Sequence, residues 1–128
     1  MSLRSPMGRV LGLGTAKGGS HHWWMQRVTS VALLFLTLWF VASLLGFSTY
    51  DYALVTGWIH KPFNAVMLSL LIATATYHSQ LGLQVVIEDY VAAKFTKIVV
   101  MILLSFVHAA LAALGIFAVL RIAFGVAA

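Results

Sequence analysis

Three long uncharged runs dominate the sequence, at residues 28–50, 62–87 and 98–120. Each is longer than the ~20 apolar residues that an α-helix needs to cross a hydrocarbon core about 30 Å thick. Only short polar connections separate the runs. The pattern therefore predicts an all-α membrane protein with three transmembrane helices, at roughly residues 28–50, 62–88 and 95–124.

The composition fits a protein whose solvent is the lipid bilayer. Hydrophobic residues make up 62% of the 128-residue chain and charged residues only 9%, too few to cover a water-soluble domain. We therefore divide the chain into an N-terminal arm at residues 1–27 and a three-helix anchor at residues 28–128. Cysteine is absent, which excludes disulfides, iron–sulfur clusters and thiolate metal sites in this chain.

The positions of the basic residues predict the orientation in the membrane. Half of the eight lysines and arginines precede the first span, at Arg4, Arg9, Lys17 and Arg27. Because Lys and Arg collect on the cytoplasmic side, we expect a cytoplasmic N-terminus and a periplasmic C-terminus. Arg121, near the opposite end, runs against this pattern. Such separated charges do not form a nucleic-acid-binding surface, and the expected partner is the bilayer.

Two histidines lie inside the expected membrane helices, where an ionisable group is a functional candidate by default. His78 is twelve residues before Tyr90, which places it about 18 Å from that end of the helix at 1.5 Å per residue. His108, in the third span, reaches a similar depth. Alanines surround His108, which favours close helix packing there, and its role stays open.

The face of the second span that carries His78 has the character of a haem-binding face. His78, Gly82 and Asp89 share this face at helical spacing. Gly82 removes the side chain one turn from the imidazole, so that a flat, bulky group can approach the backbone. A neutral imidazole beside such a patch suits axial haem ligation. The alternative is a histidine that only hydrogen-bonds a neighbouring helix, and spacing alone leaves both open.

The end of the same span carries Asp89 and Tyr90, a carboxylate and a phenol at the membrane interface. A phenolic O–H can donate a hydrogen bond to a quinone carbonyl, and a nearby carboxylate can hold it or relay a proton. Solvated interfacial residues are the alternative interpretation.

The second span resembles a known family at these positions. The motif His-x3-Gly, followed by Asp-Tyr-Val, is formed by His78, Gly82, Asp89, Tyr90 and Val91. It resembles the small hydrophobic membrane-anchor subunits of succinate dehydrogenase, respiratory complex II. The segment "HHWWMQRVTS" at residues 21–30 resembles the family's sequence before the first helix. Chain length and the three-helix layout agree as well.

The resemblance implies specific roles for the site residues. His78 would be one axial ligand of a haem b, and the other ligand would come from the cytochrome b subunit of the same complex. Tyr90, with Asp89 beside it, would hydrogen-bond ubiquinone. Arg27 and His21 would lie near the haem propionates, where a guanidinium suits a carboxylate.

The same resemblance implies the place of the chain in a larger complex. A flavoprotein subunit oxidises succinate, and an iron–sulfur subunit passes the electrons to quinone. This chain carries no flavin or iron–sulfur motif, so it would be a non-catalytic subunit in a bacterial inner membrane. Two other functions are open: a haem-free structural anchor and a small proton-coupled transporter. The transporter is disfavoured because the three uncharged runs contain no acidic residue.

Overall fold

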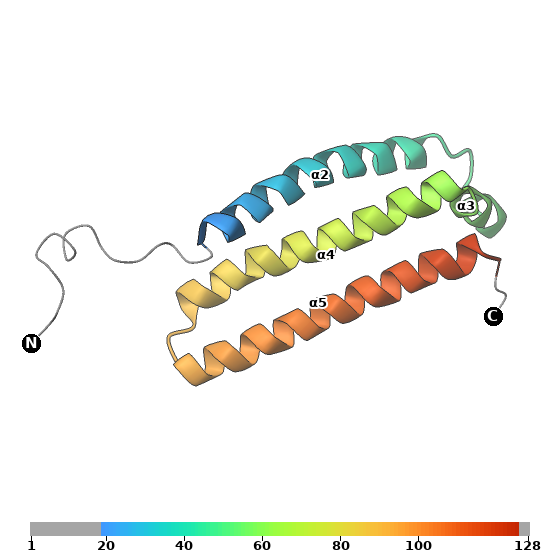
Figure 1. The fold of residues 1–128 in the computed structure, drawn as a ribbon. Coiled ribbons are helices and arrows are strands. Elements are labelled where there is room, and N and C mark those ends of the chain that lie inside the picture. Colours follow the sequence, from blue (N-terminus) through green and yellow to red (C-terminus); the bar gives the residue numbers. More distant parts are fainter. Residues whose placement is uncertain (1–18, 126–128) are drawn as a thin grey trace, which may run out of the picture.

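The computed structural model describes residues 19–125, and all the regular structure in this part of the chain is helical. Three long helices, α2 (Gly19–Leu45), α4 (Pro62–Tyr90) and α5 (Lys94–Ala123), are joined by short connections (Figure 1). Each is long and apolar enough to cross a membrane. The predicted all-α fold with three candidate spans is thus confirmed. The basic residues Arg4, Arg9 and Lys17 lie outside the described residues.

Two helical segments differ from the prediction. The first long helix already begins at Gly19, so the segment at residues 21–30 is helical and continuous with the span. A short helix, α3 (Tyr52–Ile59), occupies the connection between the first two spans. Asp51 caps α3, because its carboxylate accepts a hydrogen bond of 2.7 Å from the backbone N–H of Leu54. This bond, with a second from the Thr49 hydroxyl, lowers the pKa of Asp51.

The long helices form a row with α4 in the middle. Helix α4 packs against both α2 and α5, which lie on opposite sides of it (Figure 1). The start of α2 and the turn between α4 and α5 lie at one end of the row, which we call the turn end. Helix α3 and the end of α5 lie at the other, which we call the α3 end.

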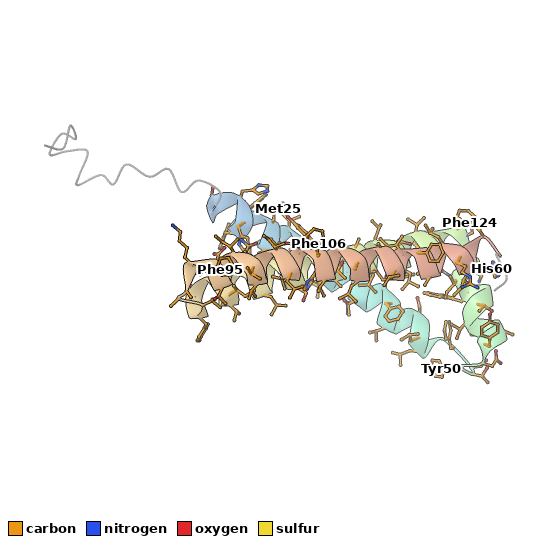
Figure 2. The ribbon with its side chains drawn as sticks, turned by 90° about the horizontal axis from the view of Figure 1, so that it is seen from below. Met25, Tyr50, His60, Phe95, Phe106 and Phe124 are labelled. Atoms are coloured by element: carbon orange, nitrogen blue, oxygen red, sulfur yellow. The ribbon has the colours of Figure 1, made fainter. Side chains whose placement is uncertain are left out.

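Few side chains are buried within the chain. Among the described residues, only Ile59, Ala65, Leu81 and Val119 are buried hydrophobics. Large apolar side chains point outward along every long helix, and Phe95, Phe106 and Phe124 follow α5 from one end to the other (Figure 2). In water such a surface would drive aggregation, so lipid or other subunits must cover it.

Aromatic rings hold the α3 end together. Trp58 of α3 stacks on Trp39 of α2, with ring centroids 5.4 Å apart. Phe63 of α4 meets Trp39 edge-on at 6.2 Å, and Phe47 meets Trp58 edge-on at 5.7 Å. These contacts join α2, α3 and α4, and each such pair contributes about 0.5–1.5 kcal/mol beyond its buried area.

Close packing of α5 on α4 depends on Gly115. A methyl group placed on Gly115 would lie 2.9 Å from Cγ2 of Ile72, closer than van der Waals contact allows. Because that methyl is fixed to a β-branched carbon, relief requires a rotamer change or a shift of the helix.

We expect Gly115→Ala to destabilise the helix pair by about 1–3 kcal/mol, the usual cost of overpacking. The measurement is the thermal midpoint of the detergent-purified assembly. Gly57→Ala is the matched control, because a methyl group there would meet nothing within 4 Å. Equal midpoints for the two variants would contradict the close approach at Ile72.

Candidate functional site

A polar cluster lies between α2 and α4, on the half of the row nearest the turn end. Helix α2 contributes His22, Gln26 and Thr29, which follow one another at spacings of four and three and so share a face. Helix α4 contributes His78 and Gly82, one turn apart. The cluster is defined by these five residues, and the surfaces around it are mostly apolar.

His78 makes a hydrogen bond across the helix pair from each of its ring nitrogens. Its Nδ1 lies 2.8 Å from Oγ1 of Thr29, and its Nε2 lies 3.4 Å from Nε2 of Gln26. Thr29 is buried, with 6% of its surface exposed, and its hydroxyl also donates to the backbone carbonyl of Met25 at 2.8 Å. The histidine of the predicted haem face is thus held against α2 rather than free.

Gly82 leaves a space that the chain's own packing does not need. A methyl group placed on Gly82 would meet only the side-chain nitrogen of Gln26, at an ordinary contact distance of 3.7 Å. This differs from Gly115, where the backbone of α5 approaches a fixed side chain. The flexible Gln26 side chain therefore lies over Gly82 and beside Nε2 of His78.

Two polar atoms of the cluster are buried without a hydrogen-bond partner: Nε2 of His22 and Oε1 of Gln26. Leaving such an atom unpaired costs about 1–3 kcal/mol. The predicted propionate residues differ in exposure from their neighbour His22. His21 is exposed, and so is Arg27, whose guanidinium carbon lies 5.5 Å from the ring centroid of Trp23.

The predicted quinone residues lie at the turn end, on the outside of the chain. Tyr90 is the last residue of α4 and is 84% exposed, and Asp89 beside it is exposed too. Their neighbour Glu88 is fixed locally: its carboxylate accepts from Gln84 at 2.8 Å, and its backbone carbonyl accepts from Lys97 at 2.7 Å. The chain therefore presents Asp89 and Tyr90 outward and encloses neither.

His108 connects α5 to α4 and has both ring nitrogens paired. Its Nδ1–H donates to the backbone carbonyl of Leu104 at 2.9 Å, and its Nε2 lies 3.3 Å from the Ser79 hydroxyl, which can donate to it. The residue is 8% exposed. The packing role favoured by the sequence agrees with this position.

Metal ligation by this chain alone would rest on very few groups. In the part of the chain that the structure describes, no three His, Asp or Glu side chains come together. Haem iron, in contrast, is held by one or two axial side chains and needs no such group of three.

Sequence reasoning missed the α2 half of the cluster. It singled out His21 and Arg27 in the segment at residues 21–30, but not His22, Gln26 or Thr29. The signal was present as three polar residues at spacings of four and three, which place them on one face of α2. It could be used only once the segment was known to be helical and to pack on α4.

Known proteins match the chain over most of its length. A family model described as succinate dehydrogenase/fumarate reductase transmembrane subunit matches residues 1–118. The succinate dehydrogenase hydrophobic membrane anchor subunit of Rickettsia bellii is 36% identical over 89 residues, which cover 70% of this chain and 71% of the relative. The protein of the same name from Rickettsia conorii is 41% identical over 80 residues, or 62% and 64% of the two chains.

A more distant relative aligns nearly end to end. The succinate dehydrogenase hydrophobic membrane anchor subunit of Paracoccus denitrificans is 30% identical over 124 residues, which cover 94% of this chain and 93% of the relative. No solved structure matches the chain. The resemblance first indicated by the second span is therefore confirmed. Given this match and three helices able to cross a membrane, the chain belongs to the succinate dehydrogenase/fumarate reductase transmembrane subunits, as a multi-pass membrane anchor.

Proposed function

We propose that this chain anchors a succinate dehydrogenase in the membrane and contributes to it one axial ligand of haem b and part of the ubiquinone-reduction site. The observation that carries the proposal is the polar cluster around His78. It places an imidazole, an uncrowded glycine and two unpaired polar atoms together in a chain that buries little else. An intramembrane ionisable residue with such surroundings marks a functional site.

The residues of the cluster fit a haem. His78 would supply Nε2 as the ligand, and Gly82 would accept the flat face of the ring beside it. The Gln26 side chain lies in that space and would have to turn aside, which its rotatable bonds permit. Haem b supplies a one-electron redox centre when it is bound. The second axial histidine would come from the cytochrome b subunit of the complex.

The propionates would lie toward the turn end, near the start of α2. Arg27 and His21 are exposed there and can reach a group outside this chain. A guanidinium can hold a carboxylate through two parallel hydrogen bonds. The unpaired Nε2 of His22 is a further donor or acceptor on the same helix.

Ubiquinone would bind beside Tyr90 and Asp89, under cover supplied by other subunits. The phenol would donate a hydrogen bond to a quinone carbonyl, and the Asp89 carboxylate would hold that phenol or pass a proton toward the reduced quinone. The strong exposure of Tyr90 is what a site shared with an iron–sulfur subunit requires. Electrons would reach that subunit from the flavoprotein subunit, where succinate is oxidised.

The proposed orientation places the turn end in the cytoplasm. Arg27, Lys94 and Lys97 lie at this end among the described residues, while Lys61 and Arg121 lie at the α3 end. The three further basic residues of the N-terminal arm strengthen the asymmetry. We accordingly propose a bacterial inner membrane with the C-terminus in the periplasm.

A haem-free structural anchor is the second candidate. It is favoured by the two hydrogen bonds of His78 within the chain, which leave the imidazole without need of a ligand. The unpaired atoms of His22 and Gln26 argue against it, because a purely structural contact would pair them.

Three predictions test the proposed function, and the first of them concerns His78. In the assembled complex, His78→Leu should abolish or strongly alter the reduced-minus-oxidised absorption of haem b, because leucine cannot coordinate iron. His108→Gln is the control, since it changes a paired histidine on the far side of α4 and should leave the spectrum as in wild type. An unchanged spectrum and midpoint potential in His78→Leu would contradict the assignment of His78 as a haem ligand and favour the haem-free anchor.

The second prediction concerns Gly82. Because the chain has room for a methyl group there, Gly82→Ala should insert and assemble normally. A haem face resting on Gly82 would meet that methyl group, and an overpacking penalty of about 1 kcal/mol would lower haem affinity by roughly fivefold. Haem per complex is the measurement, and Gly57→Ala is the control. Full haem content with an unshifted potential would mean that no flat group packs on Gly82.

The third prediction concerns Tyr90. Tyr90→Phe removes only the hydroxyl, and losing one hydrogen bond of ~0.5–1.5 kcal/mol should weaken quinone binding several-fold. The measurement is quinone-reductase activity divided by activity with a dye that takes electrons upstream of quinone. Tyr77→Phe, on the same helix, should leave this ratio unchanged. If the two variants give the same ratio at all quinone concentrations, Tyr90 is only an interfacial anchor.

A further inference from the structure

Thr29 holds an unusual position among the polar residues of this chain. Only three polar side chains are buried in the described residues, and the other two, Asn64 and His108, have partners that account for them. Thr29 is 6% exposed, and its Oγ1 lies 2.8 Å from Nδ1 of His78, closer than the 3.4 Å that separates Gln26 from the other ring nitrogen. A hydroxyl placed so deeply against an imidazole controls the hydrogen-bonding state of that ring.

We propose that Thr29 is the positioning residue of His78. Its hydroxyl oxygen accepts a hydrogen bond from the Nδ1–H of the ring, and this leaves Nε2 unprotonated on the Gly82 side for metal ligation. The inference rests on the proposed role of His78 as a haem ligand, and it names the residue that makes the ligand competent. Neither the second-span motif nor the predicted propionate residues include Thr29.

The direction of the hydrogen bond follows from counting protons. The Thr29 hydroxyl has one proton, and the Met25 carbonyl, which can only accept, lies 2.8 Å from Oγ1. Because the hydroxyl donates this proton in a hydrogen bond to the Met25 carbonyl, Oγ1 can only offer a lone pair to His78. The ring proton therefore lies on Nδ1 and donates to Oγ1. Nε2 is then the basic nitrogen, and it faces the side-chain amide of Gln26 at 3.4 Å, which can donate to it.

In the reverse arrangement Nε2 carries the ring proton and cannot coordinate a metal. If Thr29 donated to Nδ1, the ring proton would lie on Nε2 and would face the N–H donors of Gln26. That arrangement requires the Gln26 amide to be turned over, and it leaves no lone pair on Nε2 for iron. The two arrangements therefore predict opposite effects of removing the Thr29 hydroxyl.

The bond also fixes the direction in which the ring points. Because Oγ1 is tied to the backbone of α2 through Met25, the imidazole is held by a rigid helix and not by a mobile side chain. A ligating histidine whose other ring N–H is hydrogen-bonded is oriented and is a stronger donor, and losing such a partner typically costs 10–100-fold in metal affinity.

The test uses three variants in the assembled complex. Thr29→Val keeps the size and the β-branch of the side chain but removes the hydroxyl. Thr29→Ser keeps the hydroxyl, and Thr37→Val makes the same hydroxyl deletion at an exposed position on the same helix. The readouts are the amount of haem per complex under limiting haem supply and the haem midpoint potential.

In Thr29→Val we expect haem affinity to fall by about tenfold and the midpoint potential to rise, because a less basic imidazole stabilises the oxidised iron less. Thr29→Ser should restore both values toward wild type, and Thr37→Val should change neither. Rescue by serine separates the hydrogen bond from simple packing, since serine fills less space than valine.

Two results would overturn the inference. Wild-type haem content and potential in Thr29→Val would show that the hydroxyl does not position His78. Tighter haem binding in that variant would support the reverse arrangement, in which Thr29 holds the ring in the wrong tautomer. Failure of the proposed function is distinguished by His78→Leu: if that variant keeps its spectrum, His78 is no ligand, whatever Thr29 does.

Discussion

The structure depends on one constraint: in the hydrocarbon core, a polar side chain must find its partner within the protein. Two consecutive residues of α4 meet this constraint in different directions. His78 bonds Thr29 of α2, and Ser79 lies within hydrogen-bonding distance of His108 of α5. Burying apolar surface drives little association between such helices, because lipid is as apolar as leucine, so close packing and polar contacts must hold them together. The paired polar groups therefore help to set the register of α2 and α5 on α4 at one level of the membrane.

The same constraint draws attention to the buried polar atoms for which the described residues supply no hydrogen-bond partner. Nε2 of His22 and Oε1 of Gln26 are buried without partners, on the side of α2 that faces His78. In a self-sufficient bundle such atoms would be paired or replaced by apolar ones. Their presence beside an uncrowded glycine is consistent with a face that is completed by a further group and a further subunit.

Much of this fold could be predicted from sequence, because span length and charge are properties of the chain alone. The three long helices and the candidate haem face on α4 followed from uncharged runs and helical spacing. Helix α3 was missed although Asp51 is a good N-cap. The contributions of Thr29, Gln26 and His22 depend on which helices are neighbours, which spacing within one helix cannot reveal. Likewise, only the position of Ile72 separates the packing glycine Gly115 from Gly82.

The proposed haem half-site and the proposed quinone half-site differ in how far this chain alone fixes the direction of their side chains. Thr29 and His78 are already paired across two helices, so the direction of the proposed ligand is set before any partner arrives. Tyr90 is 84% exposed and Asp89 is exposed beside it, so nothing in the described chain fixes the direction of the phenol. Preorganisation lowers the entropy lost on binding, whereas an exposed side chain must be ordered by its partner. The proposed haem half-site would thus tolerate changes at the subunit interface better than the proposed quinone half-site.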